Sequence, residues 1–143
     1  MSRLLAKRQR LQRVRHVQHV LAVAETSRAR GEAANIENNA RRLAEMRGDL
    51  FGQPRQTIGA TLASQRELAA RLEQAGRQLD GALYDAQRRI VQREQIAIAA
   101  DRYRDIAERL KDKSRRAADD RFEARIAALP LYKRIQMKGK GDK

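Results

Sequence analysis

The sequence predicts an all-α protein in which two long helices form an antiparallel coiled-coil hairpin, the second helix being longer than the first. Apolar residues recur at a seven-residue spacing over most of the 143 residues, which is typical of helices wound around one another. Aromatic residues make up only 3% of the chain, so few side chains could fill a thick globular core. We therefore expect one hairpin domain in residues 1–130 and a basic flexible tail in residues 131–143.

The first helix is expected over about residues 2–50. Its N-terminal half has apolar residues at coiled-coil spacing, namely Leu4, Leu11, Val14 and Leu21. After a small phase shift the row continues through Ala29, Ile36, Leu43 and Leu50, with Ala33 and Ala40 between them. Residues that favour helix poorly cluster in the middle, namely Gly31, Asn35, Asn38 and Asn39. A kink is the most that we expect there, because the apolar row stays in phase across the segment.

A turn is expected over about residues 51–57. Gly52 suits the left-handed conformation that ends many helices, and Pro54 pushes Gln53 toward extended geometry. Thr57 is a candidate cap for the second helix through its hydroxyl group. Two amphipathic helices joined by so short a connection should fold back on each other.

The second helix is expected over about residues 58–129, with two rows of apolar residues along one seam. One row comprises Leu68, Ala75, Ala82, Ile96, Tyr103, Leu110, Ala117 and Ala124, and Tyr103 is expected in the core with its hydroxyl exposed. The other row comprises Leu72, Leu79, Ala86, Ala100, Ala107 and Ala128. Arg89 and Arg93 interrupt the seam, and we expect their aliphatic stems to cross it while their guanidinium groups reach water. A polar layer that fixes the pairing register is the alternative.

The last part of the second helix is expected to extend beyond the first. If the helices pair from the turn outward, at 1.5 Å per residue the first ends opposite about residue 105. The segment from Leu110 to Leu129 then has an apolar stripe without a partner in its own chain. Such a stripe indicates a docking surface. Pairing of this segment with a second copy in a homodimer is the alternative.

The net charge of +14 is concentrated at the two ends of the chain. Residues 1–24 contain no acidic residue, and the tail after Pro130 has five basic residues against one acidic residue. Such ends favour an acidic partner, whether protein, nucleic acid or anionic lipid. Specific nucleic-acid recognition is not expected, because no recognition-helix, zinc-finger or aromatic stacking pattern is present.

Several other classes of function are also disfavoured. No nucleophile, base and orienting acid form a recognisable catalytic set, so the protein is not expected to be an enzyme. His16 and His19 lie three residues apart but lack a third ligand, so we expect exposed histidines and neither metal nor cofactor. No apolar run approaches the ~18 residues of a membrane span. The arginine-rich start is poor in serine and continues into the first helix, which argues against a transit peptide.

The whole pattern resembles the flagellar export protein FliJ and its virulence-secretion counterparts of the YscO type. The resemblance rests on chain length, a break near one third of the chain, a longer second helix, the basic start Ser2-Arg-Leu-Leu-Ala-Lys-Arg-Gln-Arg-Leu, and the charged segment Lys113-Ser-Arg-Arg-Ala-Ala-Asp-Asp-Arg-Phe-Glu. It implies an antiparallel coiled coil similar to the central shaft of rotary ATPases. It also implies a non-enzymatic role in type III protein export, at a cytoplasmic position in bacteria beside the membrane export apparatus.

The resemblance implies two binding surfaces. The surface that faces the hexameric export ATPase would comprise Arg3, Leu4, Lys7, Arg8, Leu11, Arg121, Arg125, Leu129 and Tyr132. The surface that contacts the membrane export gate would comprise Leu68, Leu72, Ala75 and Leu79. Export chaperones are further partners to be considered. A homodimeric structural coiled coil and a basic helical nucleic-acid binder are the alternative functions.

Overall fold

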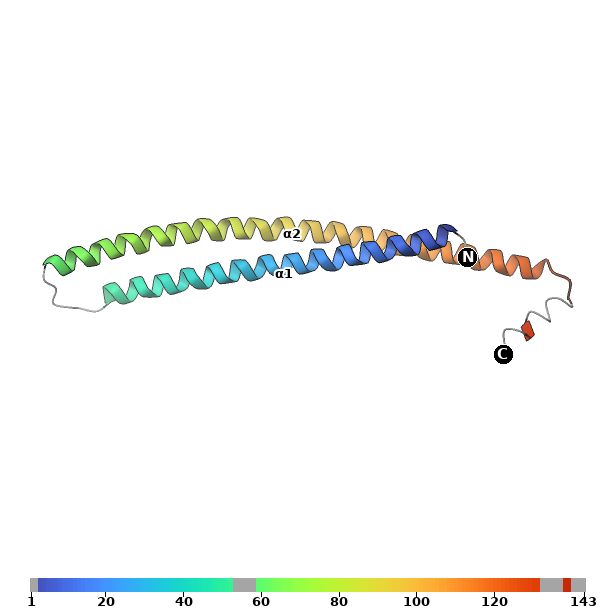
Figure 1. Ribbon diagram of the computed structural model, residues 1–143, viewed down its shortest axis with the longest axis horizontal. Coiled ribbons are helices and arrows are strands. Elements are labelled where there is room, and N and C mark those ends of the chain that lie inside the picture. Colours follow the sequence, from blue (N-terminus) through green and yellow to red (C-terminus); the bar gives the residue numbers. More distant parts are fainter. Residues whose placement is uncertain (1–2, 53–58, 132–137, 140–143) are drawn as a thin grey trace. The chain divides into compact units, whose positions relative to one another are not determined.

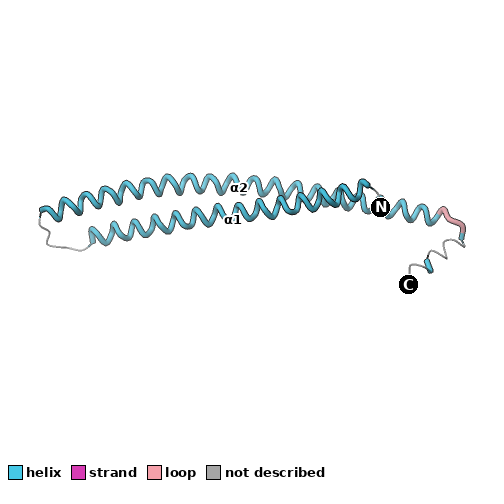
Figure 2. The backbone as a smooth tube through the Cα atoms, viewed as in Figure 1, coloured by secondary structure: helices cyan, strands magenta, loops and turns pink. Residues whose placement is uncertain are grey.

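The computed structural model describes residues 3–52, 59–131 and 138–139, and its two long elements are the α-helices α1, Arg3–Gly52, and α2, Gly59–Ala127. The two helices run antiparallel and side by side (Figure 1), and no strand occurs in the described ranges (Figure 2). The predicted all-α hairpin with a longer second helix is therefore confirmed. The chain divides into two compact units: unit 1 contains residues 1–20 and 99–143, and unit 2 contains residues 21–98.

The helix ends lie close to their predicted positions. α1 is helical throughout Gly31 to Asn39, so the polar segment does not interrupt it. The expectation of a left-handed Gly52 is wrong, because Gly52 is the last helical residue and no described glycine has a positive φ. Gln53, Pro54 and Thr57 lie outside the described residues. α2 ends at Ala127, and the N–H of Leu129 donates to the carbonyl of Ile126 at 3.1 Å just before Pro130.

Unit 2 has a thin seam made mostly of alanine. Ala29, Ala33 and Ala86 are buried, and the predicted row from Ala29 through Ile36 to Leu43 faces α2 as expected. Thr26 is also buried, and its hydroxyl donates to the carbonyl of Ala22 at 3.0 Å. This local bond satisfies the only polar side-chain atom of Thr26, so the residue fits an apolar seam without a partner on α2.

The register of unit 2 differs from the one expected. A Cβ built on Gly76 would lie 3.6 Å from Cδ2 of Leu43, so these two residues face each other. Gly52, nine residues after Leu43, then faces about residue 67, and the start of α2 extends past the end of α1 (Figure 1). The expectation of pairing directly from the turn is therefore wrong. Leu43 thus packs against α2 at Gly76, at a distance that would leave room for a Cβ.

On α2 one predicted row lies in the seam as far as Ala107, and the other is mostly wrong. Leu72, Leu79, Ala86, Ala100 and Ala107 are buried or half-buried, as predicted, whereas Ala128 at the end of that row is exposed. The second row of the seam lies on the other side of them and comprises Ala69, Gly76, Leu83, Ile90, Ala97, Arg104, Lys111 and Ala118. Of the row predicted instead, Leu68, Ile96, Tyr103, Ala117 and Ala124 are exposed, whereas Ala75, Ala82 and Leu110 are half-buried. Small residues lie on both sides of the row from Leu72 to Ala107. Residue type alone therefore did not indicate which of the two neighbouring rows faces α1.

The interrupting arginines are exposed. Nη1 of Arg89 lies 3.7 Å from Oε2 of Glu32, and Nη2 of Arg30 donates to Oε1 of Glu94 at 2.8 Å. Both ion pairs join α1 to α2, and each partner is at least two-fifths exposed. Exposed ion pairs of this kind contribute about 0–1 kcal/mol to the free energy of unfolding. They show which residues face each other but add little stability. Arg93 is exposed, in agreement with a guanidinium group that reaches water.

Two glycines of α2 provide a test of the thin seam. We expect Gly81→Ala to raise the free energy of unfolding by about 1 kcal/mol, because nothing lies within 4 Å of the added Cβ and alanine favours helix. Gly76→Ala makes an ordinary contact with Leu43 and should stabilise similarly. Urea unfolding followed by circular dichroism measures both changes. A loss of stability in Gly76→Ala alone would mean that the helices approach more closely than the structure indicates.

Candidate protein-docking surface

In unit 1, α1 turns mostly polar side chains toward α2, where Ala107 is buried. On α1 the residues that face α2 are Leu5, Arg8, Gln12, Arg15 and His19, of which only Leu5 is apolar. The predicted row of Leu4, Leu11 and Val14 is exposed instead, with 50%, 39% and 48% of each residue accessible. The predicted seam is therefore wrong over this part of the first helix. The apolar stripe exists, but α2 does not cover it.

Arg8 fixes the pairing of the helices near the start of the chain. Its Nη1 donates to the carbonyl of Leu110 at 3.2 Å and to Oγ of Ser114 at 2.5 Å. Ser114 is buried, so this hydrogen bond satisfies a hydroxyl group that water does not reach. α1 thus extends at least to Ser114 on α2, past the expected limit near residue 105. The unpaired end of α2 is shorter than predicted and does not include Leu110.

A second polar layer joins His19 to Asp101 and Arg104. Nε2 of His19 lies 3.5 Å from Oδ1 of Asp101, and Nη2 of Arg104 lies 2.7 Å from the same oxygen. Nη1 of Arg104 lies 3.4 Å from Nδ1 of His19, whose role as donor or acceptor depends on the tautomer. Nε of Arg104 is buried without a hydrogen-bond partner. His19 is half-buried, which corrects the expectation of an exposed, inert histidine, whereas His16 is exposed.

Tyr103 lies outside the seam. About half of its surface is exposed, and the guanidinium carbon of Arg15 lies 4.7 Å from the ring centroid. A cation in this position is attracted by the face of the ring. The expectation of a core tyrosine is therefore wrong, because the arginine that occupies the seam covers one ring face and leaves the remainder open.

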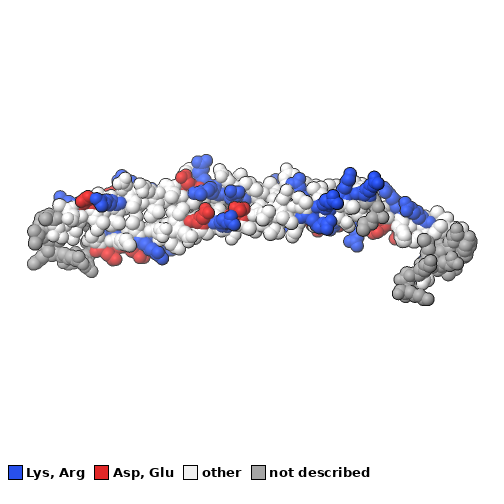
Figure 3. All heavy atoms as spheres, in the orientation of Figure 1, with Lys and Arg blue, Asp and Glu red and all other residues white. Residues whose placement is uncertain are grey.

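Most of the net charge belongs to unit 1. Its sequence contains 20 basic and 8 acidic residues, whereas that of unit 2 contains 12 basic and 10 acidic residues. Unit 1 therefore contributes +12 of the +14. Figure 3 shows Lys and Arg gathered over the part of this face that unit 1 forms, and a mixture of signs over unit 2. A field of one sign attracts acidic surfaces and speeds their association.

The residues predicted to face an ATPase fall in unit 1. Arg3, Leu4, Lys7 and Leu11 are exposed on α1, but Arg8 is half-buried and bonded to Ser114. On α2, Arg121 and Arg125 are exposed, and Leu129 is half-buried just after the helix. Tyr132 lies outside the described residues. The described members thus share one unit, but Arg121 comes seven residues after Ser114, on the part of α2 that extends past α1 (Figure 1).

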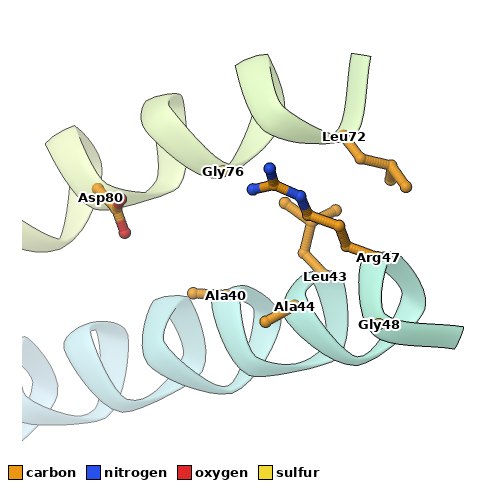
Figure 4. A pocket seen from close by; sticks show the side chains of 8 residues that line it. All are labelled: Ala40, Leu43, Ala44, Arg47, Gly48, Leu72, Gly76 and Asp80. Carbon is orange, nitrogen blue, oxygen red and sulfur yellow. The ribbon is translucent and has the colours of Figure 1, made fainter. Parts of the chain in front are cut away.

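The residues predicted to contact an export gate fall in unit 2. Leu68 is exposed, whereas Leu72, Ala75 and Leu79 are half-buried in the seam. Leu72 also lines a pocket of 460 Å³ between the helices, together with Ala40, Leu43, Ala44, Arg47, Gly48, Gly76 and Asp80 (Figure 4). The pocket exists because Gly76 and the two alanines leave space that Leu43 only partly fills. Most of the residues predicted to contact an export gate thus lie in the seam, and Leu68 is the exposed one.

A basic hollow on unit 1 was not predicted from the sequence. It has a volume of 240 Å³ and is lined by Gln9, Gln12, Arg13, Lys111 and Arg115. Three cations and two amides line it, and no acidic residue does. Its members come from parts of the chain about one hundred residues apart, so only the pairing register could have revealed them.

Neither described helix contains a stretch that is both long enough and apolar enough to span a bilayer. In the same described ranges, no three potential metal-ligating side chains of His, Cys, Asp or Glu come together. Comparison of the chain with protein-family models, curated proteins and solved structures finds no match.

Proposed function

We propose that this protein is a non-enzymatic central-shaft and escort component of a type III protein export apparatus, whose unit 1 docks into the ring of the hexameric export ATPase. The observation that carries the proposal is the concentration of charge: unit 1 contains both chain ends and +12 of the net charge. A hairpin that presents its two ends on one strongly basic unit is suited to insertion into an acidic ring. The resemblance to the FliJ and YscO proteins makes the export ATPase the partner to test first.

The exposed members of the ATPase-facing surface support this role. Arg3 and Lys7 on α1, with Arg121 and Arg125 on α2, are exposed. Arg8 contributes differently, since its bonds to Leu110 and Ser114 hold the two helices in register. Leu4 and Leu11 add exposed apolar surface beside the cations, as protein interfaces require at their centre.

Contact with the export gate belongs to unit 2 in this proposal. Leu68 is its accessible residue, while Leu72, Ala75 and Leu79 support it from the seam. The protein would act in the bacterial cytoplasm at the membrane-bound apparatus and would meet export chaperones there. The proposal requires neither a cofactor nor a metal.

Charge reversal tests the proposed docking. We expect Arg3→Glu, Lys7→Glu, Arg121→Glu and Arg125→Glu together to abolish stimulation of phosphate release by a purified hexameric type III export ATPase. The reason is that four attractive contacts become repulsive, which typically lowers the association rate most at low salt. Phosphate release is measured at several salt concentrations, and circular dichroism verifies that the variant remains helical.

A matched control makes the same change in charge on unit 2. Arg42→Glu, Arg47→Glu, Arg66→Glu and Arg93→Glu alter four exposed arginines outside the proposed surface and should leave the stimulation nearly intact. Unchanged stimulation in the unit 1 variant, or an equal loss in both variants, would contradict docking through unit 1.

A homodimeric scaffold is the second candidate. The observation that favours it is the exposed Phe122 on the part of α2 beyond Ser114, where 59% of the residue is accessible. A stable dimer in sedimentation, lost on truncation after residue 110, would support this alternative. Affinity for duplex nucleic acid that survives physiological salt would instead support a basic nucleic-acid binder.

A further inference from the structure

Both helices of unit 1 bear exposed apolar residues outside the seam. Leu11 and Val14 lie three residues apart on α1, and Tyr103, Ile106 and Leu110 follow one another at spacings of three and four on α2. Four of the five are exposed by 39% to 53%, and Leu110 is half-buried. We call these five residues the apolar flank. Its side chains would normally form a seam, yet the seam itself contains Arg8, Gln12, Arg15 and His19.

The apolar flank and the basic hollow lie on opposite sides of the pair. Gln9 and Arg115 line the hollow. Leu11 follows Gln9 by two residues, about 200° around α1, and Leu110 precedes Arg115 by five residues, about 140° around α2. Both leucines therefore point away from the hollow, and the two sides of unit 1 can be altered independently.

Cations outnumber carboxylates beside the apolar flank. The face of α2 that bears it comprises Arg102, Tyr103, Ile106, Arg109, Leu110, Lys113, Arg116 and Ala117. On α1 the flank is preceded by Lys7 and Arg10, and α1 has no acidic residue before Glu25. Asp112 and Asp120 line a hollow on α2 together with Arg109, Lys113, Arg116 and Ala117, and Asp105 lies one turn before Arg109. These carboxylates offset part of the positive charge, and the surroundings of the flank remain positive on balance.

We propose that the apolar flank is the docking site for an acidic amphipathic α-helix of a partner protein. A helix with apolar residues at spacings of three and four would cover the five flank residues as a third strand of the coiled coil. Carboxylates beside that stripe would meet Arg109 and Lys113 on α2 and Lys7 on α1. Charge complementarity selects this occupant over a second copy, which would bring the same cations against these and incur like-charge repulsion.

The flank shares Leu11 with the proposed ATPase-facing surface, and Lys7 beside it is one of the residues that test ATPase docking. The flank is therefore tested at Val14, Ile106, Arg109 and Lys113, which the docking test leaves unchanged, and the inference goes beyond the proposed function. A hairpin could dock its ends into a ring with the flank open or covered. Conversely, the flank could bind a helix in a protein that never meets an ATPase. The two proposals can therefore fail separately.

The probe for the flank is a synthetic peptide of about three heptads with leucine at the seam positions and glutamate beside them. Its affinity for the full chain is measured by fluorescence anisotropy near physiological salt. We expect Val14→Ser with Ile106→Ser to weaken binding about tenfold or more, the loss typical of central apolar contacts. We expect Arg109→Glu with Lys113→Glu to weaken it comparably. Both sets change exposed residues, so the fold should be kept, as circular dichroism can verify.

The matched control reverses two cations on the hollow side. Arg13→Glu with Arg115→Glu makes the same change in charge and should alter binding by less than about twofold, because salt screens charges beyond about 8 Å. A scrambled peptide of the same composition should not bind. If both charge reversals weakened peptide binding equally, or if the scrambled peptide bound as well as the designed one, binding would depend only on net charge. Either result would overturn the proposal. The proposal would also be overturned if the protein formed a dimer that Val14→Ser with Ile106→Ser dissociates. A second copy of the chain would then occupy the flank.

Discussion

Replacing Ala86 by aspartate is expected to unfold the hairpin or to leave it barely stable. Ala86 is 2% exposed and lies at the centre of the alanine seam of unit 2. An aspartate there would bury a carboxylate in the alanine seam, which costs about 3–5 kcal/mol. That loss is comparable to the whole stability of many small domains, about 5–15 kcal/mol. Thermal and urea unfolding followed by circular dichroism at 222 nm measures it.

Gln87→Asp provides the comparison. Gln87 is the adjacent residue on the same helix and is exposed, so the substitution carries the same intrinsic helix preference without burial. We expect it to cost only about 0.5 kcal/mol. If both variants lost the same stability, Ala86 would not be in contact with α1, and the assigned register of unit 2 would be wrong.

Replacing the polar layer of unit 1 with apolar residues is expected to have the opposite effect. His19→Leu, Asp101→Ala and Arg104→Leu together remove an ion-paired cluster that includes the unbonded Nε of Arg104. Substitution of such clusters by apolar residues of similar size often stabilises a protein by about 1–4 kcal/mol. Since the three side chains are 20% to 45% exposed, we expect the lower part of that range. The melting temperature should rise.

The control for the polar layer uses exposed residues of the same charge types on the same helices. His16→Leu, Arg102→Leu and Glu108→Ala change the composition in the same way but lie outside the seam, so stability should change by about 0.5 kcal/mol or less. A drop in melting temperature for the seam variant would show that the cluster stabilises unit 1. Its hydrogen bonds would then outweigh the cost of removing three charged or polar groups from water.

The hairpin could be predicted because its signals are local. The seven-residue spacing and the single break each depend on neighbouring residues, and so does the row Ala29, Ile36 and Leu43. Local preference and tertiary packing agree in unit 2 from Ala29 onward, and the prediction for α1 succeeded there, whereas Leu21 is exposed.

Unit 1 could not be predicted in the same way because its determinants are distant in sequence. Leu4 and Leu11 look like seam residues, whereas Arg8 looks like surface. Only a partner 106 residues away, Ser114, gives Arg8 a reason to face inward. The cation above Tyr103 also comes from far away in the sequence, at Arg15. A pattern based on hydrophobicity alone therefore assigned the apolar flank, except Ile106, to the seam and the polar layers to the surface.

The bond between Arg8 and Ser114 also bears on how the chain finds its native pairing. An alanine seam with a seven-residue repeat remains nearly complementary when one helix slips by a whole heptad, so misaligned hairpins should be close in energy. Such a slip would place Arg8 opposite Ala107, which has no side-chain oxygen and is 2% exposed. The misaligned state would then lose the side-chain acceptor of a half-buried guanidinium group. The polar groups of unit 1 thus destabilise the misaligned register, which an alanine seam alone would allow.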